Sequence, residues 1–179
     1  MSEEALDLLV ERITAEILDR ISFEVEASGR HVHLCRDHID ALFGKGHSLT
    51  SSRGLSQPAE FLSVERLTLV GPKGTIENVA ILGPERKRTQ VELSITDAKS
   101  LGVKPPVRDS GDTGGSASLI LKTATGEVTL DEGVIVAHRH VHMTPEDAER
   151  FGVSDGDRVS VRVAGDRPAV FEGVLVRVS

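Results

Sequence analysis

The chain carries the same five-residue pattern twice, Arg30-His31-Val32-His33-Leu34 and Arg139-His140-Val141-His142-Met143. Each copy leads into an acidic, helix-like stretch that ends in Phe-Gly, at residues 43–44 and 151–152. A pattern that recurs at matching positions indicates an internal duplication. The sequence therefore predicts two related halves, each of which contributes one His-x-His strand.

Two further echoes support the duplication: Asp97-Ala98 matches Asp147-Ala148, and Ile76-Glu77-Asn78-Val79 matches Phe171-Glu172-Gly173-Val174. Beyond the first 22 residues, period-two alternation and short apolar runs dominate, as is typical of strands. These runs cover residues 23–27, 65–70, 75–82, 90–95, 117–122, 127–130, 133–137, 158–163 and 169–178. We therefore expect a mainly β (α+β) fold of two related small β-barrel domains capped by short α-helices. The first half would cover residues 22–105 and the second 106–179, with the helices at 36–43, 96–101 and 145–151.

Residues 1–21 read as an amphipathic N-terminal helix. Apolar residues recur there at steps of three and four, at Leu6, Leu9, Val10, Ile13, Ile17 and Ile21. A single apolar stripe on a terminal helix requires a partner. That partner is either the helix's own domain, a second subunit, or another protein for which the helix is a targeting peptide.

Length, charge and cysteine content exclude several classes of protein. The 179 residues allow one domain or two small ones, whereas an eight-stranded α/β barrel needs about 200 residues or more. The only cysteine, Cys35, excludes an internal disulfide and a multi-cysteine zinc site and favours a reducing, intracellular location. A net charge of −7 argues against non-specific nucleic-acid binding. No apolar run approaches the length of about 18 residues that a membrane span needs.

The paired histidines are candidate metal ligands. Alternate residues of a strand share a face, so His31 and His33 point together, and so do His140 and His142. Paired imidazoles suit a divalent transition metal, above all zinc. The alternative is that these four histidines only form hydrogen bonds within strands and bind no metal. A carboxylate such as Glu92 could complete a site, and His138 shares a face with His140.

Two other features could carry chemistry. The basic loop Gly83-Pro84-Glu85-Arg86-Lys87-Arg88 could hold phosphate, with arginine offering bidentate geometry, although such a loop is also an ordinary solvated surface. Cys35 directly follows the first histidine motif and could act as a nucleophile. A lone cysteine is more often an inert small apolar side chain.

Six motifs in order resemble those of the PduL-type phosphate propanoyltransferases, the phosphotransacylases of bacterial microcompartments. They are Arg30–Leu34, Leu55-Ser56-Gln57-Pro58, Leu69–Gly74, Thr89-Gln90-Val91-Glu92, Pro106–Gly111 and Arg139–Pro145. The resemblance implies two β-barrel domains with helical caps and a dinuclear zinc site between them. It also implies the reaction acyl-CoA + phosphate ⇌ acyl-phosphate + CoA, with a short acyl group, propanoyl or acetyl.

The family correspondence assigns roles to individual residues. It implies that His31, His33 and Glu92 hold one zinc, whose open position takes the CoA sulfur, and that His140 and His142 hold the second. Arg86 matches the phosphate-binding residue. The residues along CoA would be Ser28, Arg53 and the strand from Ala80 to Leu82. Because a zinc and an arginine suffice for direct attack of phosphate on the thioester, we expect Cys35 to be dispensable.

The chain departs from its relatives at two points. Relatives carry a basic residue where this chain has Ala80, so one CoA contact is replaced or missing. Relatives also continue past the strand that ends at Ser179, into a segment whose histidine completes the second zinc. With the sequence as given, we expect two protein histidines on that metal, supplemented by His138 or by water.

The resemblance also gives the N-terminal helix a role. Residues 1–20 suit an encapsulation peptide that binds shell or core proteins, which would place a homo-oligomeric enzyme in the cytoplasm, inside a microcompartment. Two other readings stay open: a zinc-stabilised non-catalytic microcompartment scaffold, and a metal-dependent thioester hydrolase.

Overall fold

The computed structural model describes residues 3–23, 29–57 and 59–179. In chain order the elements are α1 (Glu3–Ile21), β1 (His31–His33), α2 (Arg36–Phe43), β2 (Ser51–Gly54), β3 (Phe61–Val70), β4 (Thr75–Gly83), β5 (Gln90–Glu92), α3 (Ile95–Leu101), β6 (Val107–Arg108), β7 (Ala117–Lys122), β8 (Glu127–Ala137), β9 (His140–Met143), α4 (Pro145–Phe151), β10 (Arg158–Val163) and β11 (Ala169–Val178). The mainly β class with short helices is thereby confirmed. The strand expected at residues 23–27 lies almost wholly outside the described residues.

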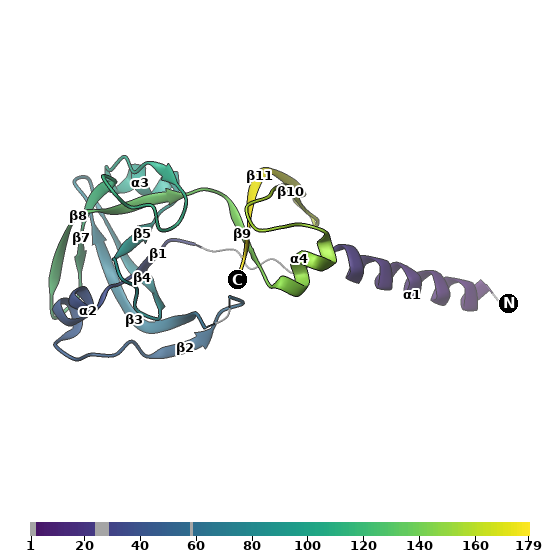
Figure 1. Ribbon diagram of the computed structural model, residues 1–179, viewed down its shortest axis with the longest axis horizontal. Helices are drawn as coiled ribbons and strands as arrows, with labels where there is room; N and C mark the ends of the chain where they lie inside the picture. The colour runs from purple at the N-terminus through teal and green to yellow at the C-terminus, as the bar shows by residue number, and fades with distance from the viewer. Residues whose placement is uncertain (1–2, 24–28, 58) are drawn as a thin grey trace.

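The larger sheet closes into a barrel. Around the ring, β3 pairs with β4, β4 with β1, β1 with β5, β5 with β8, β8 with β7, and β7 with β3 again. β2 extends the sheet beside β3, and β6 pairs with β8. In Figure 1 this barrel lies to the left, with α2 and α3 at its ends.

The barrel core consists of aliphatic side chains from alternate strand positions. Val32, Ile81 and Val91 are each fully buried in it. Because successive side chains of a strand point to opposite faces, the neighbours of these three residues lie on the other face of the sheet. That face carries the histidines of β1, so the alternation which fills the core also aims the candidate ligands away from it.

Residues 140–178 contribute a second, smaller sheet with the order β10-β11-β9. Within the described residues this sheet has three strands and is open. The runs at 117–122, 127–130 and 133–137, which the sequence assigns to the second half, form β7 and β8 and pair into the first barrel, and the short strand β6 pairs with β8. Their pairing partners β3 and β5 are distant in sequence, and the larger sheet extends to β8, which ends at Ala137.

The duplicated sequence patterns adopt matching local geometry. His31 lies opposite Ala80 on the parallel strand β4, and His140 lies opposite Leu175 on the parallel strand β11. Two residues before these partners, Asn78 (φ 56°) and Gly173 (φ 65°) both have left-handed backbone conformations. Each His-x-His strand therefore sits beside a similarly bent parallel strand.

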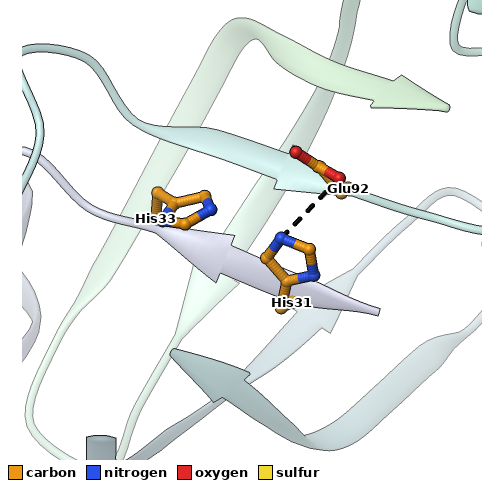
Figure 2. Close-up of side chains that lie close together, drawn as sticks. All are labelled: His31, His33 and Glu92. Carbon is orange, nitrogen blue, oxygen red and sulfur yellow. Dashed lines mark ion pairs between the residues drawn. The ribbon is translucent and has the colours of Figure 1, made fainter. Parts of the chain in front are cut away.

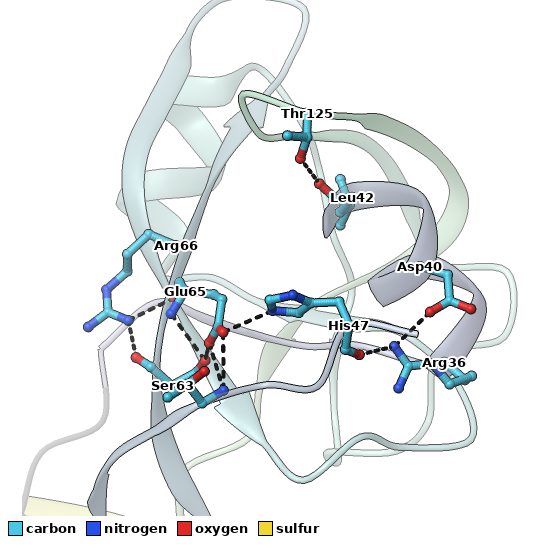
Figure 3. A network of polar contacts seen from close by, with 9 residues as sticks. Arg36, Asp40, Leu42, His47, Ser63, Glu65, Arg66 and Thr125 are labelled. Atoms are coloured by element: carbon cyan, nitrogen blue, oxygen red, sulfur yellow. Dashed lines mark hydrogen bonds and ion pairs between the residues drawn. The ribbon is translucent and has the colours of Figure 1, made fainter. Parts of the chain in front are cut away.

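Polar contacts fasten the segments around α2 to the barrel (Figure 3). Glu65 of β3 accepts hydrogen bonds from His47, from Ser63 and from the amide of Thr50. The hydroxyls of Thr123 and Thr125, in the β7–β8 turn, both donate to the carbonyl oxygen of Leu42 near the end of α2, at 2.5 and 2.6 Å. A helix leaves its last carbonyls without internal partners, and here a hairpin distant in sequence satisfies one of them.

The N-terminal helix extends away from the sheets, beyond α4 (Figure 1). Its apolar residues Leu6, Leu9, Val10, Ile13 and Ile17 are all exposed. Beside it, the ring of Phe23 packs edge-on against Phe151 of α4, with centroids 5.2 Å apart. No helix in the described part of the chain combines the length and apolar content that crossing a membrane requires.

Candidate metal centre

Two neighbouring strands bring three candidate ligands together. In the antiparallel pairing of β1 with β5, His31 lies directly opposite Glu92, and His33 lies opposite Gln90. The potential ligand atoms of His31, His33 and Glu92 all lie within 4.8 Å of one another, and all three residues are buried. Figure 2 shows the two imidazoles on β1 and the carboxylate of β5 converging on one space.

The contacts of the two histidines are compatible with metal binding. The Nδ1 of His31 is 2.9 Å from the carbonyl oxygen of Gly29, which leaves its Nε2 facing Glu92 Oε2 at 3.7 Å. The Nδ1 of His33 is buried and has no hydrogen-bond partner among the described residues. Buried polar atoms are rarely left unpaired, and two imidazoles with a carboxylate form a typical zinc donor set. The residues present therefore fit a zinc ion.

The electrostatic surroundings keep His33 in the ligating form. Burial, reinforced by the neighbouring Arg86 and His31, lowers the pKa of His33 to about 3. The imidazole is thus neutral at physiological pH, as metal ligation requires.

The second carboxylate oxygen of the cluster is already engaged. Glu92 Oε1 accepts hydrogen bonds from Gln90 Nε2 at 2.6 Å and from Ser110 Oγ at 2.8 Å. Gln90 Nε2 also reaches Ser110 Oγ at 2.9 Å. The carboxylate is therefore held from one side while Oε2 faces His31.

The second histidine pair has the same internal arrangement in a more open setting. His140 Nδ1 is 2.7 Å from the carbonyl oxygen of His138, and His138 Nδ1 is 2.8 Å from Asp109. His140 is half-buried and His142 is exposed. Desolvation, followed by the influence of His140 and Arg177, lowers the pKa of His142. Among the described residues, His140 and His142 do not join a third ligating side chain in one cluster.

Arg86 lies beside the first cluster. Its backbone N–H donates to the carbonyl oxygen of Leu34, and its guanidinium Nη2 is 2.7 Å from Glu60 Oε1. Arg86 also contributes to the lowered pKa of His33, which shows that its charge acts on the cluster. The structure thus places the expected phosphate-binding side chain near the ligands, in an ion pair with a carboxylate.

The remaining candidate residues are distributed along the same region. Ala80 and Leu82 flank the core residue Ile81 on β4, so they use the sheet face that carries His31. Arg53 is exposed on β2. Ser28 lies outside the described residues. Cys35 follows β1, where its Sγ accepts a hydrogen bond from Thr89 Oγ1 at 3.4 Å.

Sequence reasoning missed three side chains that the structure brings to this region: Gln90, Ser110 and Glu60. Gln90 and Glu92 are two residues apart on one strand, so period-two alternation already places them on one face. Ser110 lies within the Pro106–Gly111 motif of the family resemblance, but the resemblance assigns no role to its side chain and no local signal pairs it with Glu92. Glu60 immediately precedes β3, and no sequence signal pairs it with Arg86.

Comparison with known proteins gives a consistent result. The model of the family described as phosphate propanoyltransferase matches residues 24–179. A phosphate propanoyltransferase of Listeria monocytogenes is 52% identical over 179 residues, which cover 100% of this chain and 84% of the relative. Proteins of the same name from Clostridioides difficile and Enterococcus faecalis are 50% and 53% identical, covering 85% and 82% of their own lengths.

Proposed function

This chain belongs to the phosphate propanoyltransferase family and is a phosphotransacylase, and on that premise we propose that it works through a dinuclear zinc centre. The acyl group is short, propanoyl or acetyl, and the reaction is acyl-CoA + phosphate ⇌ acyl-phosphate + CoA. The observation that carries the proposal is the buried cluster of His31, His33 and Glu92, with an unpartnered nitrogen on His33 among the described residues.

The first zinc would be held by His31, His33 and Glu92. Zinc in that position would supply Lewis-acid stabilisation to the thiolate leaving group. The three side chains come from two paired strands of a closed barrel, so their positions are fixed before substrate arrives. Such preorganisation is what electrostatic catalysis needs.

The phosphate would be bound by Arg86. A guanidinium offers planar, bidentate hydrogen bonds to a phosphate oxygen pair. In the structure Arg86 holds the carboxylate of Glu60 instead, so phosphate binding exchanges one anionic partner for another. Attack by the bound phosphate on the thioester carbonyl forms the new O–C bond as the C–S bond breaks, with no enzyme nucleophile.

The CoA would lie along the sheet face beside the first cluster, on Ala80 and Leu82 of β4, with Arg53 of β2 as a further contact. The family resemblance adds Ser28 to the proposed CoA contacts. The register of β4 against β1 supports this placement, because Ala80 is the direct neighbour of His31. Ala80 offers no charge to the CoA phosphates, so Arg53 is the basic side chain proposed for that contact.

The second zinc would use His140 and His142. The proposal rests on the match between the two His-x-His strands and on the charges near them: Glu60 and Glu92 are close enough to influence the pKa of His142. Metal analysis of the full chain tests it, because two zinc ions per chain are expected. A stoichiometry of one would contradict the dinuclear centre while leaving the first site in place.

The activity assay follows free thiol when the protein is mixed with phosphate and either propanoyl-CoA or acetyl-CoA. We expect thiol release that depends on phosphate. Release without phosphate would indicate a thioester hydrolase, and no release from zinc-loaded protein would indicate a non-catalytic scaffold. The ratio of the two kcat/KM values decides which acyl group is preferred.

The N-terminal helix is proposed to direct the enzyme to the shell or core proteins of a microcompartment. Its exposed apolar row supports a docking role. Removing residues 1–20 should leave kcat and KM unchanged and abolish co-purification with shell proteins. A drop in oligomeric state on removal would show instead that the row joins copies of this chain into a homo-oligomer.

A further inference from the structure

Ser110 lies in the loop between β6 and β7, yet its side chain reaches the carboxylate of β5. We propose that Ser110, together with Gln90, is a positioning residue that fixes Glu92 so that only Oε2 is offered to a metal. This inference rests on the proposed zinc site of His31, His33 and Glu92.

Each hydrogen bond among Gln90, Glu92 and Ser110 uses a different hydrogen atom. The Ser110 hydroxyl donates to Glu92 Oε1, and the two N–H groups of the Gln90 amide are directed to Glu92 Oε1 and to Ser110 Oγ. The orientation of that amide is set by its oxygen, which accepts from the backbone N–H of Gly111 at 2.7 Å. Two donors thus converge on Oε1, and Oε2 has none of them.

Burial makes these contacts matter. Gln90 is 3% exposed and Glu92 is 9% exposed. A carboxylate removed from water is costly unless hydrogen bonds compensate it, and hydrogen bonds to a charged acceptor are stronger than those between neutral groups. The two donors therefore stabilise the charged carboxylate and also restrict its rotation.

The second sheet also holds the loop that carries Ser110. The guanidinium of Arg177, on β11, is 3.4 Å from the carbonyl oxygen of Ser110, and Arg177 lies opposite His142 in the β9–β11 pairing. Asp109, the preceding residue, contacts His138. The loop is thus fastened on both sides, and its serine is held against Glu92 by more than its own hydroxyl.

Zinc affinity is the measurement that separates positioning from a purely structural role. We would titrate the metal-free full chain with zinc against a chromogenic chelator and compare wild type with Ser110→Ala. Loss of a residue that orients a ligand typically weakens metal binding by about 10–100-fold, and that loss is expected at the site of His31, His33 and Glu92. Ser110→Thr, which retains a hydroxyl, should recover most of the affinity.

Ser100→Ala is the matched control, because that serine is on α3 and its hydroxyl donates within its own helix, to the carbonyl oxygen of Thr96. Zinc affinity of Ser110→Ala within about twofold of wild type would overturn the proposal. So would an unchanged affinity combined with a lower thermal midpoint of the metal-free protein, which would give Ser110 only a structural role. Absence of zinc binding by wild type would instead overturn the proposed metal centre itself.

Discussion

The two His-x-His motifs are alike within each pair and differ in what surrounds them. The imidazole rings of His31 and His33 are 5.0 Å apart at 89°, and those of His140 and His142 are 5.1 Å apart at 86°. In both pairs the first histidine directs Nδ1 to the carbonyl oxygen two residues before it. Local sequence therefore sets the geometry of a pair.

The neighbouring strands decide whether a pair becomes a three-ligand cluster. β1 lies between parallel β4 and antiparallel β5, and β5 supplies Gln90 and Glu92. β9 has parallel β11 on one side, and it is an edge strand of its sheet within the described residues. The comparison teaches that the histidine motif supplies two ligands, whereas the third comes from a strand paired to it.

The largest effect is expected from removing one ligand of each pair in turn. Loss of a residue that supports a metal ligand lowers activity by up to about 100-fold. His33→Ala should lower kcat/KM by more than that, because it removes one of the proposed ligands themselves. His142→Ala should release one zinc and leave the other bound. The test measures the zinc content per chain and the rate of thiol release for both variants. Equal loss of both metals in either variant would show that the two motifs act as one site.

Arg86→Ala tests the first histidine pair, because the charge of Arg86 helps to lower the pKa of His33. We expect KM for phosphate to rise by about 10–100-fold, in line with loss of a charge-assisted bidentate contact, while KM for the acyl-CoA stays within about twofold. Initial rates at varied phosphate and varied acyl-CoA measure both. An unchanged rate at low phosphate would refute the assignment of Arg86.

Acid conditions should affect the barrel more than the second sheet, because the barrel holds Glu65. Burial would raise the pKa of Glu65, but hydrogen bonds from Ser63, Thr50 and His47 outweigh it and lower the pKa to about 2. A lowered folded-state pKa stabilises the fold above the unfolded value of 4.5, and this contribution is lost as the pH falls toward 2.

The variant Glu65→Gln should remove that pH dependence and cost about 1–3 kcal/mol at neutral pH, the usual loss for a charged hydrogen-bond acceptor. Urea unfolding of metal-free protein at neutral pH and at pH values between 4.5 and about 2 measures it. A variant whose stability falls with acid as steeply as wild type would contradict the assignment to Glu65.

The smallest effects are expected at Cys35 and Thr144, which lie two residues after His33 and His142, the second histidine of each motif. Both are helix N-caps, but Thr144 accepts a hydrogen bond from the amide of Asp147, while Cys35 makes no side-chain cap. Thr144→Ala should lower the free energy of unfolding by about 1 kcal/mol.

Cys35→Ser should keep full activity and not lower stability, and loss of activity in the folded variant would restore Cys35 as a nucleophile candidate.

Much of this arrangement could be predicted from local patterns. Period-two alternation placed His31 with His33 and marked the strands, and the helices at 36–43 and 145–151 have the expected bounds. The position of Glu92 beside the pair followed from the family resemblance, and the pairing of β1 with β5 explains it.

The remainder depends on contacts between segments distant in sequence. Parallel pairing of β5 with β8, and the closure of the ring through β7 and β3, assign residues 107–137 to the barrel. Pairing register is decided by the assembled sheet, not by composition along the chain. The contacts of Ser110 with Glu92 and of Glu60 with Arg86 have the same origin, so no local signal announces them.

The threonine hydroxyls that bind the Leu42 carbonyl have a consequence for how the molecule opens. They tie the end of α2 to the β7–β8 hairpin, so α2 cannot unwind from that end without releasing the hairpin. Amide hydrogens of α2 and of the hairpin should then exchange with solvent as one cooperative unit. α1, whose apolar face is exposed, should exchange much faster. The strand that carries His31 and His33 immediately precedes α2, and it therefore belongs to the slowly opening part of the protein.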